Sequence, residues 1–157
     1  MGIDPGLRRT GYGVVRVAPK PELIEAGIVK TDEKLPLEQR LCQIHDGLSQ
    51  VIKEFGPHSV AIEDLYSVYK HPRTAIMMGH ARGMAFLAAA QRDVPVASYS
   101  ATRIKKALTG NGQAGKLQMQ RTIQSVFRLK ELPKPADVAD ALAIALCHAY
   151  TQMRKRK

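Results

Sequence analysis

Four carboxylates interrupt segments that are otherwise apolar, and this pattern restricts the possible folds more than any other feature of the sequence. Asp4 and Glu63 each end a short apolar run. Asp137 and Asp140 lie inside a long apolar stretch near the C-terminus. Burying carboxylates without partners is costly, and neighbouring negative charges add to the cost. A fold that gathers these side chains therefore needs positive charge to hold them, and a divalent cation is the most economical source.

The rest of the chain is strongly basic. It has 24 Lys and Arg residues against 14 Asp and Glu residues, which gives a formal net charge of +10. This balance indicates a polyanionic partner such as DNA or RNA. Charge alone leaves open a generally basic protein, for example a ribosome-associated factor. An acidic pocket inside a basic protein is the combination that metal-dependent chemistry on nucleic acid requires.

At 157 residues the chain has the length of one domain with a proper core, which we expect to occupy residues 1–152. The basic segment 153–157 is predicted to be a disordered tail. Cys42 and Cys147 both lie in apolar helical patterns. We predict that they are small core residues in a reducing compartment, rather than a disulfide pair or a zinc site.

The order of apolar segments predicts an α/β fold. Strands are predicted at residues 1–4, 11–17, 22–29, 58–63 and 94–99. Helices are predicted at residues 35–55, 74–91, 102–108, 116–128 and 135–152. Three strands followed by alternating helices and strands indicate a mixed five-stranded sheet, with an antiparallel front and helices on both faces. Few apolar residues precede Asp4, so either the first strand is unusually short or the native chain begins upstream.

The helix predicted at 74–91 is apolar nearly all round. An amphipathic surface helix would have a polar face, so we expect burial on two sides, against the sheet and against a second copy of the chain. A wholly internal helix is the alternative. The apolar run within this segment is interrupted by His80 and Arg82 and is too short to span a bilayer. We therefore expect a soluble, cytoplasmic protein without a membrane partner.

The carboxylates have spacings that suit a metal site. Asp4 precedes a Pro-Gly turn where the first strand leaves the sheet, which is where sites form in open α/β sheets. Asp137 and Asp140 are three residues apart, so they share one face of a helix. Asp137 alone could compensate the helix dipole, and Glu63 alone could begin a polar loop. Jointly the four favour a site for Mg²⁺ or Mn²⁺, which hard carboxylate oxygens suit.

Two further segments are candidates for nucleic-acid contact. Tyr66 follows Glu63 by three residues and could stack on an unpaired base, and Lys70 and Arg73 would give the same loop a basic surface. The alternative is a Tyr66 ring packed on the sheet. Lys105 and Lys116 flank the glycine-containing segment 109–115, whose backbone could approach a phosphate closely. A solvated charged loop is the alternative there.

The His148 side chain lies two helical turns beyond Asp140 on the same predicted face. A histidine in such an apolar helix could serve as a further metal ligand. We expect it instead to be a residue at the edge of the core.

Four segments resemble, in order along the chain, the motifs of the RuvC family of Holliday-junction resolvases. They are GIDPGLRRTGYGV at 2–14, AIEDLY at 61–66, HARG at 80–83 and ADALAIA at 139–145. The resemblance implies a ribonuclease-H-like fold, a homodimer, and Mg²⁺-dependent paired cuts in four-way DNA junctions that leave 5′ phosphate and 3′ hydroxyl ends. It also implies that the RuvA-RuvB branch-migration complex is a partner. His80 stands where the family usually has Gln.

The same resemblance implies roles for single residues. Asp4, Glu63, Asp137 and Asp140 match the family's metal-binding carboxylates, which could hold two Mg²⁺ ions per subunit, with Mn²⁺ able to substitute. A two-ion site can activate the attacking water and stabilise the leaving oxygen. Tyr66 matches the base-stacking aromatic, with Tyr69 as a second candidate because the segment 66–82 has an apparent insertion. Lys105 and Lys116 match lysines near the scissile phosphate.

Three rival functions are also compatible with the sequence. The chain could be another ribonuclease-H-like hydrolase that acts on RNA or on RNA–DNA hybrids. It could also be a catalytically silent protein that binds junctions, although such a protein would be free to lose the four carboxylates. A sugar-kinase or actin-like ATPase also begins with a strand, an Asp and a nearby Gly, but the sequence has no second glycine-rich phosphate loop.

Overall fold

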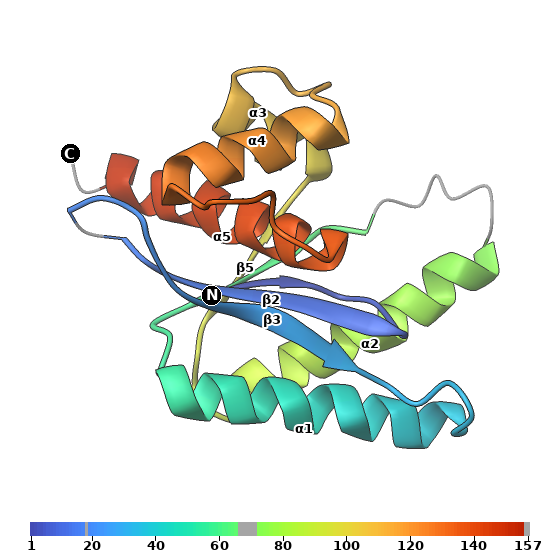
Figure 1. Cartoon of the computed structure of the whole chain (residues 1–157). Coiled ribbons are helices and arrows are strands. Elements are labelled where there is room, and N and C mark those ends of the chain that lie inside the picture. The colour runs from blue at the N-terminus through green and yellow to red at the C-terminus, as the bar shows by residue number, and fades with distance from the viewer. Residues whose placement is uncertain (18, 66–71, 156–157) are drawn as a thin grey trace.

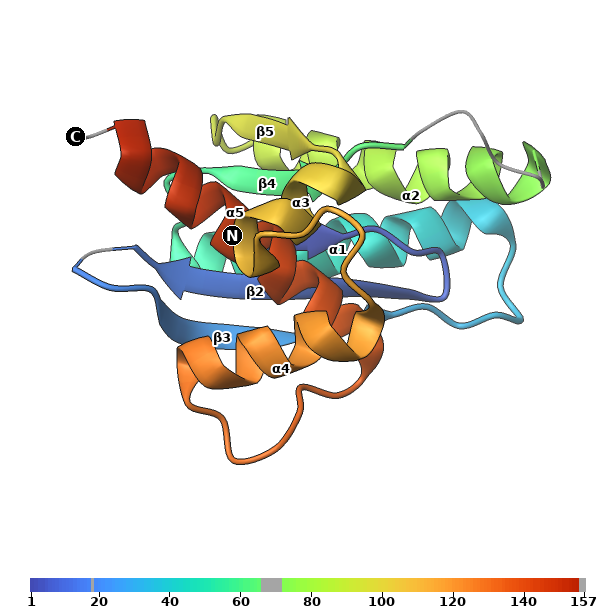
Figure 2. The same cartoon turned by 90° about the horizontal axis from the view of Figure 1, so that it is seen from above.

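The computed structural model describes residues 1–17, 19–65 and 72–155. Over these residues, five strands form one mixed sheet in the order β3-β2-β1-β4-β5, with helices on both faces (Figures 1 and 2). The strands are β1 (Gly2–Asp4), β2 (Arg9–Arg16), β3 (Glu22–Lys30), β4 (Val60–Glu63) and β5 (Val96–Tyr99). The helices are α1 (Leu37–Phe55), α2 (Pro72–Ala90), α3 (Ala101–Thr109), α4 (Lys116–Phe127) and α5 (Ala136–Lys155). The predicted mixed five-stranded sheet is confirmed.

The central strand β1 sets the register of the whole sheet. It pairs antiparallel with β2, and β2 pairs antiparallel with β3, which is the meander that the sequence predicts. On its other side β1 pairs parallel with β4, and β4 pairs parallel with β5. The carboxyl ends of β1 and β4 therefore lie at the same edge of the sheet. β1 is only three residues long, but it is hydrogen-bonded on both sides.

One face of the sheet packs against α1 and α2 through large aliphatic side chains. Ile3 and Ile62 point to this face and are fully buried. α1 meets them with its apolar stripe, in which Ile44 and Leu48 are fully buried. α1 ends at Gly56, which adopts the left-handed conformation and donates its N–H to the last turn of the helix. This face is a conventional aliphatic core between a sheet and an amphipathic helix.

The other face of the sheet packs against α5 through glycine and alanine. A Cβ atom on Gly11 would overlap the backbone carbonyl of Asp137, and one on Gly2 would overlap that of Ala141. Gly13 lies under the Leu142 side chain in the same row. The backbone of α5 therefore lies almost directly on β1 and β2, and Figure 2 shows the helix crossing the sheet. Glycine is required here because any side chain would push the helix away.

Two details differ from the predictions made from sequence. α5 continues to Lys155, three residues beyond its predicted end, so the first part of the predicted tail is helical. The prediction that Cys42 is a core residue is wrong, because Cys42 is exposed whereas Cys147 is buried. Cys42 precedes the buried Ile44 by two residues, which is a rotation of about 200° around the helix. Within the described residues, none of the helices is both long enough and apolar enough to span a membrane.

α2 packs on α1 through small residues and leaves apolar residues on its outer side. Ala81 and Ala85 are fully buried. Ile76 and Leu87, by contrast, are 60% and 43% exposed. The helix is therefore not wholly internal. The predicted burial against the sheet is present, because Ala81 and Ala85 belong to the same core as the strand residues, and a second apolar surface faces outward.

Candidate functional site

The ends of β1 and β4 bring Asp4 and Glu63 together. Ile3 is the register partner of Ile62, and the next residue on each strand is one of the two carboxylates. Side chains alternate along a strand, so Asp4 and Glu63 point to the face opposite Ile3 and Ile62, which is the face that α5 covers. The sequence predicted that these strand ends could meet, and they are neighbours in the sheet.

α5 brings the other two carboxylates to the same edge. Asp4 pairs with Gly11 across β1 and β2, and the backbone of Asp137 lies on Gly11. Asp140 follows one turn later in the helix. The pKa of Asp4 is raised from 3.8 to about 7, first by burial and then by the negative charges of Asp140, Glu63 and Asp137. The four residues, which we call the carboxylate cluster, therefore share one electrostatic environment.

Burial also raises the pKa of the other inward carboxylates. For Glu63, desolvation is the largest cause, Asp140 and Asp64 add to it, and Lys105 opposes it. For Asp140, desolvation is again the largest cause, and Lys116 opposes it. The neighbouring lysines thus compensate only part of the negative charge. A bound cation would relieve the remainder.

The carboxylate cluster fits a divalent cation by its chemistry, but it is not a preformed cage. Within residues 1–17, 19–65 and 72–155, no three His, Cys, Asp or Glu side chains come close enough together to hold a metal ion. Asp140 lies 3.7 Å from the Lys116 ammonium, and Asp137 lies 3.7 Å from Arg9. Because like charges repel, carboxylates spread toward neighbouring cations. The cluster supplies hard oxygen ligands, which are the type that Mg²⁺ prefers.

A cavity of about 230 Å³ opens beside the cluster, and we call it the acidic cavity. Glu63 and Asp140 line it together with Lys105 and Lys116, and the remaining lining residues are mostly apolar. Both predicted phosphate-binding lysines therefore lie beside the predicted metal-binding carboxylates. This arrangement could hold a phosphate against the lysines while the carboxylates hold a cation.

Of the other predicted DNA-binding residues, the structure describes Arg73 alone. Arg73 lies exposed near the start of α2 and is not among the residues that line the acidic cavity. Tyr66, Tyr69 and Lys70 lie outside the described residues. Their predicted roles therefore stay predictions.

Arg82 of α2 lies at the candidate site, although the sequence analysis assigned it no function. Its guanidinium donates hydrogen bonds to the Glu63 carbonyl (3.1 Å), the Asp64 carboxylate (3.2 Å) and the Ser98 hydroxyl (3.0 Å). It also stacks on the Phe86 ring at 4.6 Å. Arg82 therefore ties the end of β4 to α2 and to β5. An arginine in the middle of an apolar helix was the signal that could have identified it.

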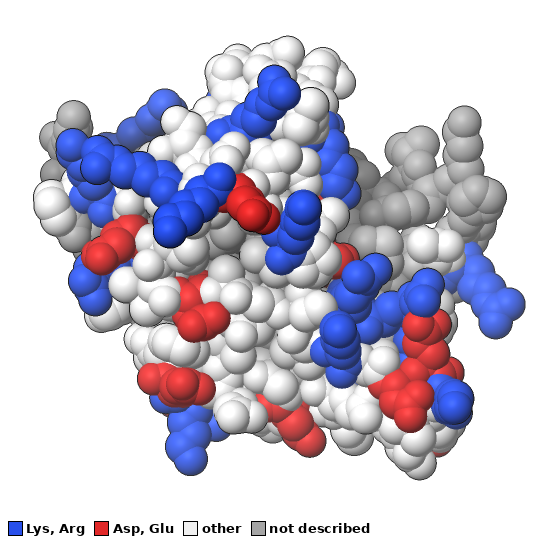
Figure 3. Space-filling model, in the orientation of Figure 1, with Lys and Arg blue, Asp and Glu red and all other residues white. Residues whose placement is uncertain are grey.

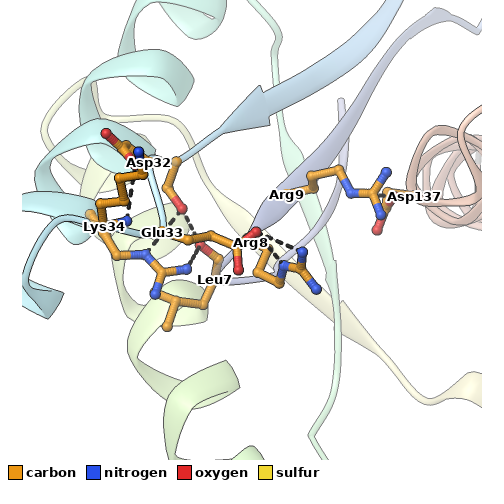
Figure 4. A network of polar contacts seen from close by, with 9 residues as sticks. Leu7, Arg8, Arg9, Asp32, Glu33, Lys34 and Asp137 are labelled. Atoms are coloured by element: carbon orange, nitrogen blue, oxygen red, sulfur yellow. Dashed lines mark hydrogen bonds and ion pairs between the residues drawn. The ribbon is translucent and has the colours of Figure 1, made fainter.

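Arg9 is the second residue that sequence reasoning missed. In Figure 4 its side chain points toward Asp137, whereas the adjacent Arg8 pairs with Glu33. The Arg9 and Asp137 side chains are both partly exposed, so their ion pair is weak. No sequence pattern distinguished Arg9 from Arg8, because only the fold decides which of them lies beside α5.

His148 is a residue at the edge of the core, as the sequence predicted. Its ring is buried and shares hydrogen bonds with the Ser59 hydroxyl (2.8 Å) and the Tyr99 hydroxyl (2.7 Å). These partners lie on β5 and just before β4. They lie at the opposite end of α5 from Asp137. Each ring nitrogen of His148 therefore has a hydrogen-bond partner within the protein.

Basic side chains dominate the surface over the helices on the α5 side. In Figure 3, Lys and Arg predominate on the upper part of the molecule, which in the same view of Figure 1 is occupied by α3, α4 and α5. Asp and Glu are more frequent on the lower part. The carboxylate cluster thus lies on the basic side of the sheet, which suits a polyanionic substrate.

Comparison with known proteins identifies close relatives over nearly the whole chain. The family model "Crossover junction endodeoxyribonuclease RuvC" matches residues 1–148. The protein of that name from Rhodopirellula baltica is 50% identical over 96% of this chain and 85% of its own length. Its counterpart from Desulforamulus reducens is 45% identical over 95% and 91%. The structure of T. thermophilus RuvC in complex with Holliday junction substrate matches with a TM-score of 0.92 at 38% identity, covering 98% of this chain and 94% of the other.

Proposed function

The chain belongs to the RuvC family of crossover junction endodeoxyribonucleases, and on that premise we propose that it cuts four-way DNA junctions at the carboxylate cluster. The observation that carries the proposal is the convergence of four carboxylates and two lysines at one edge of a ribonuclease-H-like sheet. The solved relative with Holliday junction substrate supports the choice of DNA. The biological role is resolution of junctions in homologous recombination and DNA repair.

Asp4, Glu63, Asp137 and Asp140 would hold Mg²⁺, with Mn²⁺ able to substitute. The hard oxygen donors support this assignment because Mg²⁺ prefers them. The raised pKa of Asp4 supports it because burial and three neighbouring carboxylates penalise its negative charge, which a cation would relieve. When bound, such a cation supplies an activated water and charge stabilisation for phosphodiester hydrolysis. Of the chain's own groups, Lys105 and Lys116 in the acidic cavity would bind phosphate oxygens of the substrate.

Two copies of the chain would act together. The exposed Ile76 and Leu87 on α2 support a two-fold dimer through this helix, as do Gly79 and Gly83, where a Cβ would meet nothing within 4 Å. A dimer duplicates the carboxylate cluster, so each copy would nick one of two opposing strands. Family membership supports the RuvA-RuvB complex as partner, and action on chromosomal junctions would take place in the cytoplasm.

Contacts to unpaired bases and to the junction arms would come from the segment after β4. Tyr66 would stack on a base, and Lys70 and Arg73 would bind phosphates. Tyr66→Ala should impair cleavage more than Tyr66→Phe, because stacking requires the ring rather than the hydroxyl. Equal damage from both changes would contradict the stacking role.

The proposal is tested with three labelled substrates: a four-way junction, a linear duplex and an RNA–DNA hybrid. Each is incubated with Mg²⁺, Mn²⁺ or EDTA. We expect cleavage of the junction alone, with either metal and not with EDTA. Cleavage of the hybrid in preference to the junction would instead identify another type of ribonuclease-H-like hydrolase, and junction binding without cleavage would identify a silent binding protein.

Paired cutting is tested with a junction extruded as a cruciform from a supercoiled plasmid. Coupled nicks by a dimer convert the plasmid to linear DNA, whereas independent nicks give open circles. Sedimentation of the free protein measures its oligomeric state. Open circles as the main product at full conversion, or a monomer at micromolar concentration, would overturn the paired-cut mechanism.

A further inference from the structure

A second and larger hollow lies beside α3 and the C-terminal half of α5, and we call it the distal groove. Its volume is about 680 Å³, against about 230 Å³ for the acidic cavity. Three cationic side chains line it, those of Arg103, Lys106 and Arg154. No Asp or Glu is among its described lining residues, so its charge is not neutralised from within. The groove therefore suits an anionic ligand.

The distal groove is lined by hydrogen-bond donors, of which some are held in place and others are free to move. The Arg103 guanidinium lies over the Tyr99 ring at 4.8 Å, which limits its freedom, and the Tyr99 hydroxyl is itself held by His148. Thr102 and Thr151 add hydroxyl groups to the wall. Guanidinium, ammonium and hydroxyl groups along one hollow are the usual protein contacts to the sugar-phosphate backbone.

α3 separates the distal groove from the acidic cavity. Ala101, Ile104 and Lys105 face the acidic cavity, whereas Thr102, Arg103 and Lys106 face the groove. One short helix thus presents cations to both hollows. A DNA strand bound at the acidic cavity would need only to cross this helix to reach the groove.

We propose that the distal groove binds the phosphate backbone of a junction arm, at the point where the DNA strand extends from the acidic cavity across α3. The proposal rests on the function proposed above and adds a second anchoring surface to it. An α-helix with its side chains is about 10–12 Å wide, and DNA rises about 3.4 Å per nucleotide along a strand, so the anchored phosphates lie about three nucleotides from the cut. The continuity of cations across α3 favours DNA over an acidic peptide, which would need only one hollow.

Charge-removing variants measure the contribution of the groove. Lys106→Gln is compared with Lys53→Gln, an equal charge change at an exposed position on α1, which covers the other face of the sheet. Junction affinity is measured by fluorescence anisotropy in EDTA at several salt concentrations. We expect Lys106→Gln to weaken binding about tenfold at 50 mM salt and to lower the slope of log affinity against log salt by about 1. Arg154→Gln should behave like Lys106→Gln.

If the affinity and salt slope of Lys106→Gln and Arg154→Gln match those of Lys53→Gln, the proposal is overturned. The same holds if Lys106→Gln leaves junction binding intact but abolishes retention on an immobilised polyglutamate peptide, because the occupant would then be an acidic peptide. Folding of each variant is checked by circular dichroism. Both positions lie at the surface, so the parent spectrum is expected.

Crosslinking locates the bound DNA. The exposed Cys42 is replaced by Ser, and a photoactivatable azidophenacyl group is attached at Lys106→Cys, since the remaining Cys147 is buried. Crosslinks on the junction backbone about three nucleotides from the cleavage position are expected. Crosslinks absent from the junction, or confined to the ends of the arms, would overturn the proposal.

These measurements separate the groove from the catalytic function. The affinity measurements are made without metal and without cleavage, so they detect DNA in the groove even if the carboxylate cluster proves inactive. Conversely, a protein that cleaves junctions while Lys106→Gln binds like its control would retain the proposed function and lose only the distal groove.

Discussion

The two faces of the sheet are built in opposite ways. On the face covered by α1 and α2, fully buried side chains such as Ile3, Ile62 and Leu48 separate the layers. On the face covered by α5, Gly2 and Gly11 let the helix backbone lie directly on the strands. The first face has a large apolar area and no member of the carboxylate cluster. The second has little side-chain volume at this contact and holds the whole cluster at one end.

The two faces therefore contribute differently: the α1 face mainly to the stability of the fold, and the α5 face mainly to the position of the carboxylates. Aliphatic packing tolerates small shifts because side chains can repack, and it supplies much of the free energy of folding. Backbone contact through glycine tolerates no added atoms, so it fixes where α5 starts relative to β1. Asp137 lies at that contact, and Asp140 follows it by one turn. We therefore expect changes on the α1 face to alter stability, and changes on the α5 face to alter activity.

The largest expected effect comes from the carboxylate cluster itself. Asp4→Asn or Asp140→Asn should lower the cleavage rate about a thousandfold or more, because the proposed cation site would lose a ligand. Junction binding should persist or tighten, since the phosphates meet less negative charge. Glu54→Gln, at an exposed position of α1, is the matched control. Cleavage at the parental rate by either variant in Mg²⁺ would remove that residue from the metal site.

The second prediction compares one residue from each face. Gly11→Ala should lower cleavage about 10- to 100-fold, because its Cβ would displace Asp137, and should cost about 1–3 kcal/mol of stability. Leu48→Ala should cost about 2–5 kcal/mol yet leave the cleavage rate per folded molecule unchanged. Chemical denaturation and single-turnover cleavage measure the two quantities. If Leu48→Ala lost activity and Gly11→Ala did not, the assignment of stability to the α1 face and of activity to the α5 face would be wrong.

Arg82 lies on α2 but holds the backbone of Glu63 at the end of β4, so its effect should be intermediate. Arg82→Ala leaves the Asp64 carboxylate and the Glu63 carbonyl without their donor, which costs about 1–3 kcal/mol. We expect about tenfold slower cleavage and a higher Mg²⁺ requirement, with partial recovery in Arg82→Lys. Arg92→Ala, at an exposed position just after α2, is the control. An unchanged Mg²⁺ requirement in Arg82→Ala would reduce Arg82 to a purely structural residue.

The fold could be predicted from the sequence because its elements carry strong local patterns. The apolar spacing along α1 and the short apolar runs of β4 and β5 gave the elements, and their order gave the layers. The exposure of Cys42 was missed because an apolar neighbourhood in sequence does not reveal the angular position around a helix. The length of α5 was missed because basic residues at a helix C-terminus are favourable, and they conceal where the helix ends.

The carboxylates of the candidate site stand out in the sequence, but their connections to other residues do not. Asp4, Glu63 and the two aspartates of α5 were visible as acids in apolar surroundings. Arg9 and Arg82 were not assigned, because an ion pair between distant segments depends on register and helix placement. The close approach of Asp137 to Gly11 likewise depends on tertiary packing, which no local pattern encodes.

The smallest expected effect is a dependence of metal-free stability on pH. The pKa of Asp4 rises from 3.8 to about 7 in the folded protein, so between these values the native state holds a proton that the unfolded chain has released. Stability should therefore fall as pH rises from about 4 to about 7 and stay low above that. The pKa values of Glu63 and Asp140 are also raised, so they add to the trend with the same sign.

Thermal unfolding in EDTA between pH 5 and pH 8 measures this trend. We expect the midpoint temperature of unfolding to fall by a few degrees over this range. Asp4→Asn should flatten the curve, because the amide does not titrate, whereas Glu54→Gln on the α1 face should not. Mg²⁺ should raise the midpoint more at pH 8 than at pH 6, because protons compete with the cation for the same carboxylates. A midpoint that rises with pH in EDTA, or an equal slope in Asp4→Asn, would show that the buried carboxylate cluster does not set the pH dependence of stability.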